Sequence, residues 1–145
     1  MKLYTIGFTQ KDARTFFELL KKNQIELLID IRLNNASQLA GFTKGRDLEY
    51  FLKEIAEIRC IHNIRLAPTK DILDDYKKKR ITWGEYEKRY NLLIETRKTE
   101  KEFANLFNYN NICLLCSEPD AKQCHRRLLA EYLQKHYQEI EIIHI

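Results

Sequence analysis

Apolar residues along the chain fall into short continuous runs and into helical spacings. The runs at 3–6 and 27–31 are typical of buried parallel strands. Between them, apolar residues from 13 to 20 recur at i, i+3, i+4 and i+7, which predicts an amphipathic helix over 12–22. The first 31 residues therefore predict a strand–helix–strand unit and, with it, a parallel sheet.

The same two patterns continue to the end of the chain after an irregular stretch at 34–45. They predict a helix around 48–55, a strand near 60–63, a helical region over 72–107, a strand over 112–117, a helix from about 121 to 136 and a strand over 140–145. The capping-box sequences Thr82-x-x-Glu85 and Thr99-x-x-Glu102 predict helix starts near 83 and 100.

This order of elements predicts the α/β class, with a three-layer α/β/α architecture and a mostly parallel sheet of about five strands. A length of 145 residues predicts one domain over 1–145. The architecture is Rossmann-like or flavodoxin-like without a nucleotide fingerprint, because neither G-x-G-x-x-G nor a Walker loop occurs. No cofactor is expected.

The composition is that of an ordinary globular protein, with 44% hydrophobic and 32% charged residues. No apolar run reaches the roughly 18 to 20 residues of a membrane helix, and the first ten residues turn polar too soon for a signal peptide. We therefore expect a cytoplasmic protein without a membrane partner. Its four cysteines, Cys60, Cys113, Cys116 and Cys124, are then expected as reduced thiols.

The net charge of +4 is spread along the chain. Residues 1–72 carry 12 Lys/Arg against 9 Asp/Glu, and residues 73–145 carry 13 against 12. A nucleic-acid partner is permitted but not indicated by this balance. The densest basic run, 77–80, fits a solvated helix end or a phosphate contact.

Reactive side chains gather where the predicted strands end, which is where parallel sheets bind ligands. The four strand ends and the segment 120–127 hold Asp30, Arg32, His62, Arg65, Glu118, Cys124, His125, Arg126 and Arg127. If the last helix begins near Asp120, its dipole and the adjacent arginines would lower the pKa of the Cys124 thiol and favour a nucleophilic thiolate. The helical projection turns His125 inward, Arg126 to the edge of the apolar face and Arg127 to solvent.

Asp30 needs a partner because a buried carboxylate is costly. Arg32 and Arg126 are both candidates, and a structural clamp and an anion site both remain open. Cys113 and Cys116 face opposite sides of a strand and cannot share a metal ion. Cys116, Cys124 and His125 form the weaker alternative for a metal, and we expect none.

Three segments resemble the DUF488 family of uncharacterised small proteins. They are Tyr4-Thr-Ile-Gly-Phe-Thr9, Leu28-Ile-Asp-Ile-Arg32 with the loop to Phe42, and Leu114-Leu-Cys-Ser-Glu118 through Cys124-His-Arg-Arg-Leu-Leu-Ala-Glu131. The resemblance implies that the motif positions are Gly7, Asp30, Arg32, Cys116, Glu118, Cys124, His125 and Arg126. It names no reaction.

This chain departs from the family pattern in two places. Phe8 and Thr9 stand where the family's first motif usually has His and Ser, and the loop after Arg32 has Asn34-Asn35-Ala36-Ser37-Gln38 in place of Pro and Ser-Arg. An imidazole and a basic group are thereby lost from the expected site, which is consistent with an altered or inactive member.

Two functional hypotheses follow. In the first, a small enzyme takes an anionic, phosphate-bearing substrate such as a nucleotide or a nucleic-acid end. Arg32 and Arg126 bind the anion beside Gly7 and Cys116, Asp30 or Glu118 is the general base, and Cys124 is the nucleophile with His125. In the second, a non-enzymatic module binds nucleic acid or a protein, and its motif residues form a structural polar network. The sequence decides neither this choice nor the oligomeric state.

Overall fold

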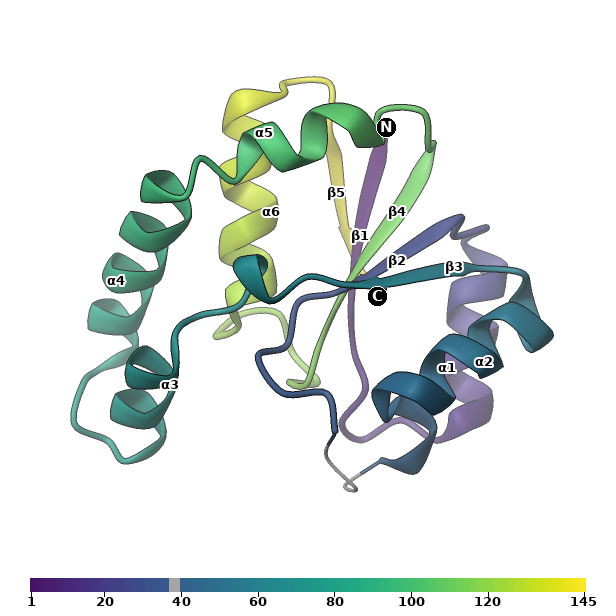
Figure 1. Ribbon diagram of the computed structural model, residues 1–145, viewed down its shortest axis with the longest axis horizontal. Helices are drawn as coiled ribbons and strands as arrows, with labels where there is room; N and C mark the ends of the chain where they lie inside the picture. The colour runs from purple at the N-terminus through teal and green to yellow at the C-terminus, as the bar shows by residue number, and fades with distance from the viewer. Residues whose placement is uncertain (37–39) are drawn as a thin grey trace.

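A five-stranded sheet forms the centre of the computed structural model, which describes residues 1–36 and 40–145. Its strands are β1 Lys2–Gly7, β2 Leu27–Asp30, β3 Arg59–His62, β4 Asn111–Cys116 and β5 Glu141–His144. All pairings are parallel, in the order β3-β2-β4-β1-β5, and the sheet is strongly twisted (Figure 1). The predicted parallel sheet of about five strands is confirmed.

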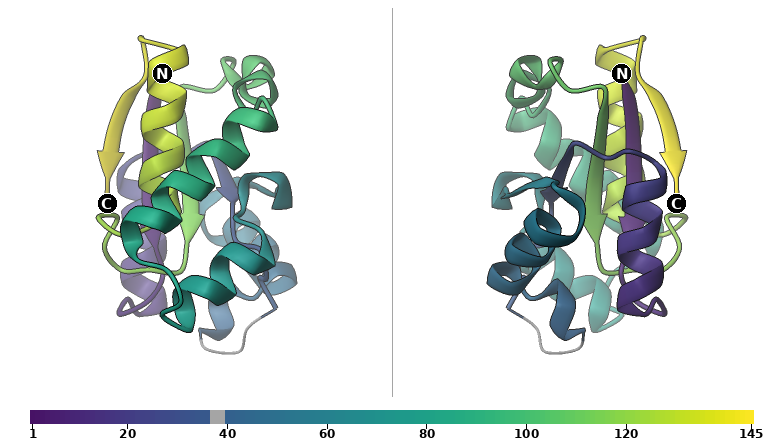
Figure 2. Two further views of the ribbon diagram at one scale, coloured as in Figure 1. Left: turned by 90° about the vertical axis from the view of Figure 1, so that its left-hand side faces the viewer. Right: turned by 90° about the vertical axis from the view of Figure 1, so that its right-hand side faces the viewer.

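Helices cover both faces of the sheet. They are α1 Ala13–Lys22, α2 Gly45–Ala56, α3 Lys70–Lys77, α4 Trp83–Thr96, α5 Glu100–Phe103 and α6 His125–His136, with 3-10 turns at Gly41–Thr43, Ile64–Leu66 and Ala104–Leu106. The helices α1 and α2 pack on one face, and α3 to α6 lie over the other (Figure 2). The two cores on opposite faces of the sheet establish the predicted three-layer α/β/α fold.

The register of the sheet brings the ends of β1, β2 and β4 together. Because β4 lies between β1 and β2, Gly7 pairs with Cys116, and Asp30 pairs with Leu115 one residue earlier. Side chains alternate along β4, so Cys113 lies in the core under α1 and α2, whereas Cys116 lies in the core under α4 and α6. The predicted separation of these two cysteines is confirmed.

Side-chain caps mark the starts of α1, α3 and α4. The predicted cap at Thr82 is confirmed, since its hydroxyl accepts a hydrogen bond from the Glu85 N–H at 3.2 Å. The predicted helix start near 100 is confirmed, since α5 begins at Glu100. The capping box predicted there is wrong, because the Thr99 hydroxyl makes no cap bond and Glu102 binds Arg65 instead, at 2.6 Å.

The expected start of the last helix near residues 120–121 is also wrong, because α6 begins at His125. The Asp120 carboxylate accepts a hydrogen bond from the Lys122 N–H at 2.7 Å, which favours a turn over a helix. The Arg126 guanidinium binds the carbonyl oxygens of Glu118 and Pro119 and holds the preceding loop in place.

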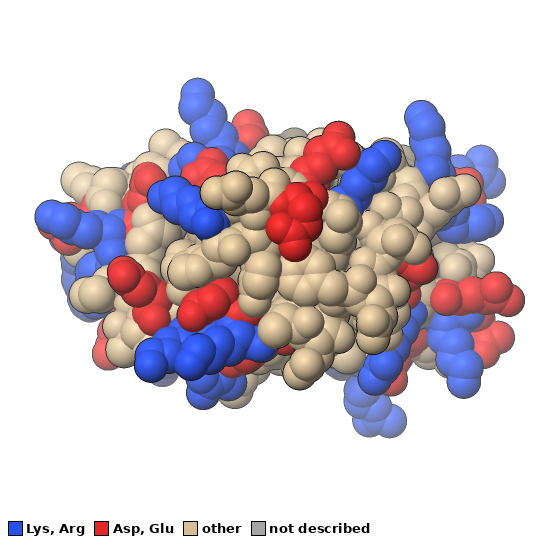
Figure 3. Space-filling model, turned by 90° about the horizontal axis from the view of Figure 1, so that it is seen from above, with Lys and Arg blue, Asp and Glu red and all other residues tan. Residues whose placement is uncertain are grey.

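The surface carries interspersed charges where the amino ends of the strands lie. Acidic and basic side chains alternate around a tan centre in the view from above (Figure 3). In the described part of the chain, no helix combines the length and the apolar character needed to cross a membrane. The expected irregular stretch at 34–45 contains the turn Gly41–Thr43, and its residues 37–39, including Ser37 and Gln38, lie outside the described residues.

Candidate functional site

Two cysteines and a histidine meet at the end of β4. Cys116 is the last residue of β4, Cys124 is the residue that precedes α6, and His125 is the first residue of that helix. The Cys124 thiol donates to Cys116 Sγ at 2.8 Å, and His125 Nδ1 lies 3.7 Å from the same sulfur. All three side chains are at most 6% exposed. The site therefore places one sulfur between two hydrogen-bonding groups.

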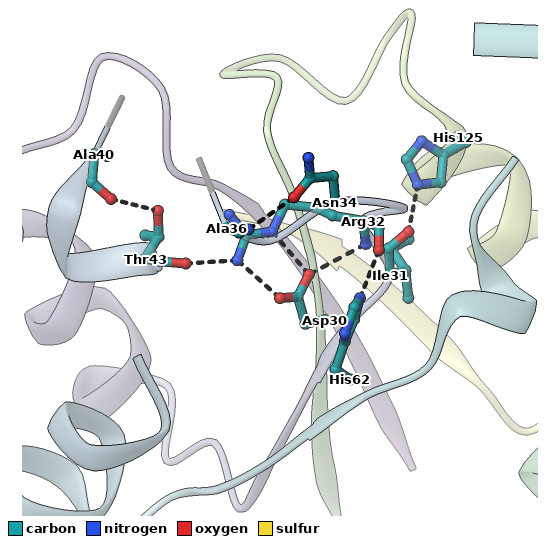
Figure 4. A network of polar contacts seen from close by, with 9 residues as sticks. All are labelled: Asp30, Ile31, Arg32, Asn34, Ala36, Ala40, Thr43, His62 and His125. Carbon is teal, nitrogen blue, oxygen red and sulfur yellow. Dashed lines mark hydrogen bonds and ion pairs between the residues drawn. The ribbon is translucent and has the colours of Figure 1, made fainter. Parts of the chain in front are cut away.

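The imidazole of His125 is held by groups from two other elements. Its Nε2 lies 3.0 Å from the backbone oxygen of Ile31, just beyond the end of β2, so Nε2–H donates to this carbonyl (Figure 4). Nδ1 therefore faces Cys116. The ring of Tyr90 packs edge-on against the imidazole at 5.4 Å between centroids. The predicted inward direction of His125 is confirmed, and the carbonyl that orients it could not be found in the sequence.

Protons in this cluster are distributed unevenly. The hydrogen bond from Cys124 holds the pKa of Cys116 well below its ordinary value of 9.0 against the effect of burial, and the charge of His125 adds to the shift. Burial is the largest single effect on His125 and lowers its pKa, but the negative charge of Cys116 and the hydrogen bonds to Cys116 and Ile31 together outweigh burial and raise this pKa. Both shifts favour a thiolate on Cys116 and a proton on His125.

The pKa of Cys124 is raised, contrary to the expectation from the sequence. The hydrogen bond to Cys116 raises the pKa of Cys124, and burial raises it further. The expectation of a Cys124 thiolate assumed a helix that begins near Asp120. Because α6 begins at His125, Cys124 precedes the helix and its thiol is used as a donor. Of the two thiols, Cys116 is therefore the one whose pKa is lowered.

Asp30 and Arg32 form a buried ion pair at the end of β2. Arg32 Nε and Nη2 donate to the two carboxylate oxygens of Asp30, each at 2.8 Å, and Nη2 also donates to the Thr43 carbonyl at 2.6 Å (Figure 4). His62 Nε2 binds the Arg32 carbonyl at 2.7 Å. Of the two partners that the sequence leaves open for Asp30, the structure selects Arg32. The centroid of the Phe8 ring lies 5.2 Å from the Arg32 guanidinium carbon, which gives a cation–π contact.

Arg126 is buried on the other side of the site, at 1% exposure. Its guanidinium donates to the carbonyls of Glu118 and Pro119 and to the Thr5 hydroxyl. A Cβ on Gly7 would collide with the Glu118 carbonyl and with this guanidinium, so only glycine fits there. The expected edge position of Arg126 is wrong, because the loop that precedes α6 closes over its side chain.

A cleft of about 900 Å³ opens beside the cluster. Cys116, Cys124 and His125 line it together with Arg32 and the exposed Glu118. The remaining lining includes the aromatic side chains of Tyr76, Trp83 and Tyr86. It also includes three exposed lysines, Lys70, Lys77 and Lys79. The sequence showed the aromatic spacing and the basic run 77–80, but it gave no reason to join them to the sheet edge. Their position depends on how α3 and α4 pack.

The same three side chains are also the candidates for a metal ion among the described residues. Their donor atoms lie within 4.8 Å of one another, and a sulfur and nitrogen set suits zinc. Two sulfurs on one tetrahedral zinc, however, stand roughly 3.8 Å apart, given bonds of about 2.3 Å. The observed 2.8 Å is about 1 Å too short. The geometry fits a thiol–thiolate pair better than a zinc site.

The comparisons with known proteins identify the family of the chain. No curated protein and no solved structure matches the chain. The family model described as "Domain of unknown function DUF488" matches residues 12–133, which include Asp30, Cys116 and His125. This match covers most of the 145 residues, and the chain belongs to the DUF488 family.

Proposed function

We propose that this protein is an enzyme in which the Cys116 sulfur attacks a small anionic, phosphate-bearing substrate bound in the cleft. The observation that carries the proposal is the Cys116–His125–Ile31 arrangement on the cleft wall. A nucleophile, an imidazole in contact with it and a third group that orients the imidazole are the parts that covalent catalysis needs. The distances of 3.7 Å from Cys116 Sγ to His125 Nδ1 and of 3.0 Å from His125 Nε2 to the Ile31 carbonyl oxygen support this assignment.

The lining of the cleft supports the substrate class. Lys70, Lys77 and Lys79 provide positive charge for a phosphate, and the rings of Tyr76 and Trp83 provide apolar faces for a base or another flat group. A mononucleotide combines both features. A volume of about 900 Å³ is within the usual range for small-molecule sites.

The proposed roles follow from which groups are free to move a proton. Cys116 Sγ forms a bond to the electrophilic centre of the substrate, and the leaving group departs with the proton of His125 Nδ1. Of the two carboxylates predicted as bases, Asp30 is held by Arg32, whereas Glu118 lies exposed on the cleft. We assign Glu118 to a substrate hydroxyl or water, and we assign Asp30, Arg32 and Arg126 to the positioning of the cleft walls.

Ligand binding can be measured directly through Trp83, which is the single tryptophan of the chain and lines the cleft. Titration with AMP, CMP and inorganic phosphate is expected to change its fluorescence for the nucleotides. Replacement of Lys70, Lys77 and Lys79 by alanine is expected to weaken nucleotide binding at least about tenfold, which equals roughly 1.4 kcal/mol. The control replaces the exposed Lys22, Lys53 and Lys135, which do not line the cleft.

The reactivity of Cys116 is tested by alkylation followed by mass spectrometry. Iodoacetate is expected to modify Cys116 faster than the neutral iodoacetamide does, and the lysine variant is expected to lose this preference. Cys60, whose pKa burial raises to about 12, is the slow internal reference. Equal rates at Cys116 and Cys60, or nucleotide affinity that is unchanged in the lysine variant, would refute the proposal.

A further inference from the structure

Cys116 and Cys124 are in contact, whereas the other two cysteines lie elsewhere in the fold. Cys113 packs on the opposite face of the sheet, and Cys60 lies on the edge strand β3. The separation of 2.8 Å between the two Sγ atoms exceeds a disulfide bond by only about 0.75 Å. The chain therefore holds one pair of thiols that is close enough to cross-link.

We infer that Cys116 and Cys124 are a reversible redox site, which hydroperoxides convert from a dithiol into a disulfide. The inference shares the Cys116 sulfur with the proposed function and adds a mode of regulation to it. The disulfide would remove both the nucleophile and the thiol that donates to it.

The surrounding backbone permits the bond to close. Cys116 ends a strand in the middle of the sheet, but Cys124 follows an irregular loop and has an extended backbone, with φ −141° and ψ 142°. A shift of Cys124 by less than 1 Å thus displaces the loop and leaves the ladder of β4 intact. Both cysteines are lining residues of the cleft, which provides a route for a small oxidant.

The two thiols have different chemical roles. Cys116 Sγ attacks the outer oxygen of the hydroperoxide, the O–O bond breaks, and the departing alkoxide takes the proton of His125 Nδ1. Cys116 is then a sulfenic acid. Cys124 Sγ next attacks the Cys116 sulfur, and the expelled hydroxide leaves as water with the Cys124 proton. In sum, two thiols and one hydroperoxide give a disulfide, an alcohol and water, and a thiol reductant reverses the oxidation.

The test treats the chelator-washed full chain with a small excess of hydrogen peroxide and measures the intact mass and the tryptic peptides. The expected product has lost two hydrogen atoms, and a disulfide joins the peptides 102–122 and 123–126. Peptide 102–122 also contains Cys113, so the variant C113S is the matched control and should retain the cross-link. Dithiothreitol should restore both thiols and the alkylation of Cys116.

The variant C124S separates this inference from the proposed function, because serine retains a donor for Cys116 but forms no disulfide. It should still be alkylated at Cys116, and peroxide should leave a sulfenic acid that dimedone traps. A wild-type chain that over-oxidises at Cys116 without a cross-link, or that cross-links through Cys113 or Cys60, would overturn the redox site and leave the proposed function standing. Slow alkylation of Cys116 in a chain that does cross-link would overturn the proposed function and leave the redox site standing.

Discussion

Replacement of Asp30 by alanine tests whether its carboxylate holds the sheet edge together. Asp30 is 1% exposed and Arg32 is 4% exposed, and two hydrogen bonds of 2.8 Å join their side chains. Without the carboxylate, the guanidinium stays buried with the Thr43 carbonyl and the Phe8 ring as neighbours. An uncompensated buried charge follows from this single change.

Breaking a buried ion pair on one side costs about 3–5 kcal/mol. A domain of this size has a free energy of unfolding of about 5–15 kcal/mol, so the loss is a large part of the total. At roughly 2–4 °C per kcal/mol, the midpoint of thermal unfolding should fall by roughly 6–20 °C. A general base that contributed nothing to the fold would instead lower activity at unchanged stability.

Urea unfolding followed by Trp83 fluorescence measures this loss. The double variant D30L/R32M removes both charges and is expected to recover most of the stability, so the two single changes are strongly non-additive. Asp71→Ala, at an exposed position, is the control and should stay within about 0.5 kcal/mol of the wild type. A loss below about 1 kcal/mol in D30A, or additive effects of D30A and R32M, would refute the structural role.

Three further predictions concern single groups. The rate of Cys116 alkylation should be half-maximal at a pH below the ordinary thiol pKa of 9.0. C124A should move this midpoint up to or beyond 9.0, whereas C124S should keep it low. An unchanged midpoint in C124A would contradict the role of the Cys124 donor. Because the pKa of Cys116 is lowered on folding, its contribution to stability is full above the ordinary thiol pKa and is lost as the pH falls through the lowered value. Gly7→Ala should reduce the free energy of unfolding by about 1–3 kcal/mol, because the new Cβ overlaps Glu118 and Arg126. The control Gly41→Ala, where a Cβ meets nothing within 4 Å, should change it little. Equal effects of the two changes would count against the close approach of Glu118 and Arg126 to Gly7. Thr99→Val should raise the free energy of unfolding by about 1 kcal/mol, since the buried Thr99 hydroxyl lacks a hydrogen-bond partner among the described residues. Calorimetry measures this change, with Thr96→Val at an exposed site as the control. A loss of stability in Thr99→Val would show that the Thr99 hydroxyl has a partner.

Local patterns in the sequence determined the fold. Continuous apolar runs predicted strands buried on both faces, and the helical spacings between them predicted the helices that cover a parallel sheet. The same alternation separated Cys113 from Cys116. Because parallel strands end at one edge, the pattern also predicted that Asp30, Cys116 and His125 lie in one region.

Tertiary structure alone decided which group does what at that edge. The sequence spacing fixes neighbours within one helix or strand, but the pKa of Cys116 depends on Cys124 across a loop, and the orientation of His125 depends on Ile31, 94 residues away. The turn at Asp120 shifts the start of α6 to His125, and Cys116 rather than Cys124 is the thiol with the lowered pKa. Charge and proton positions follow distances between elements, and packing sets those distances.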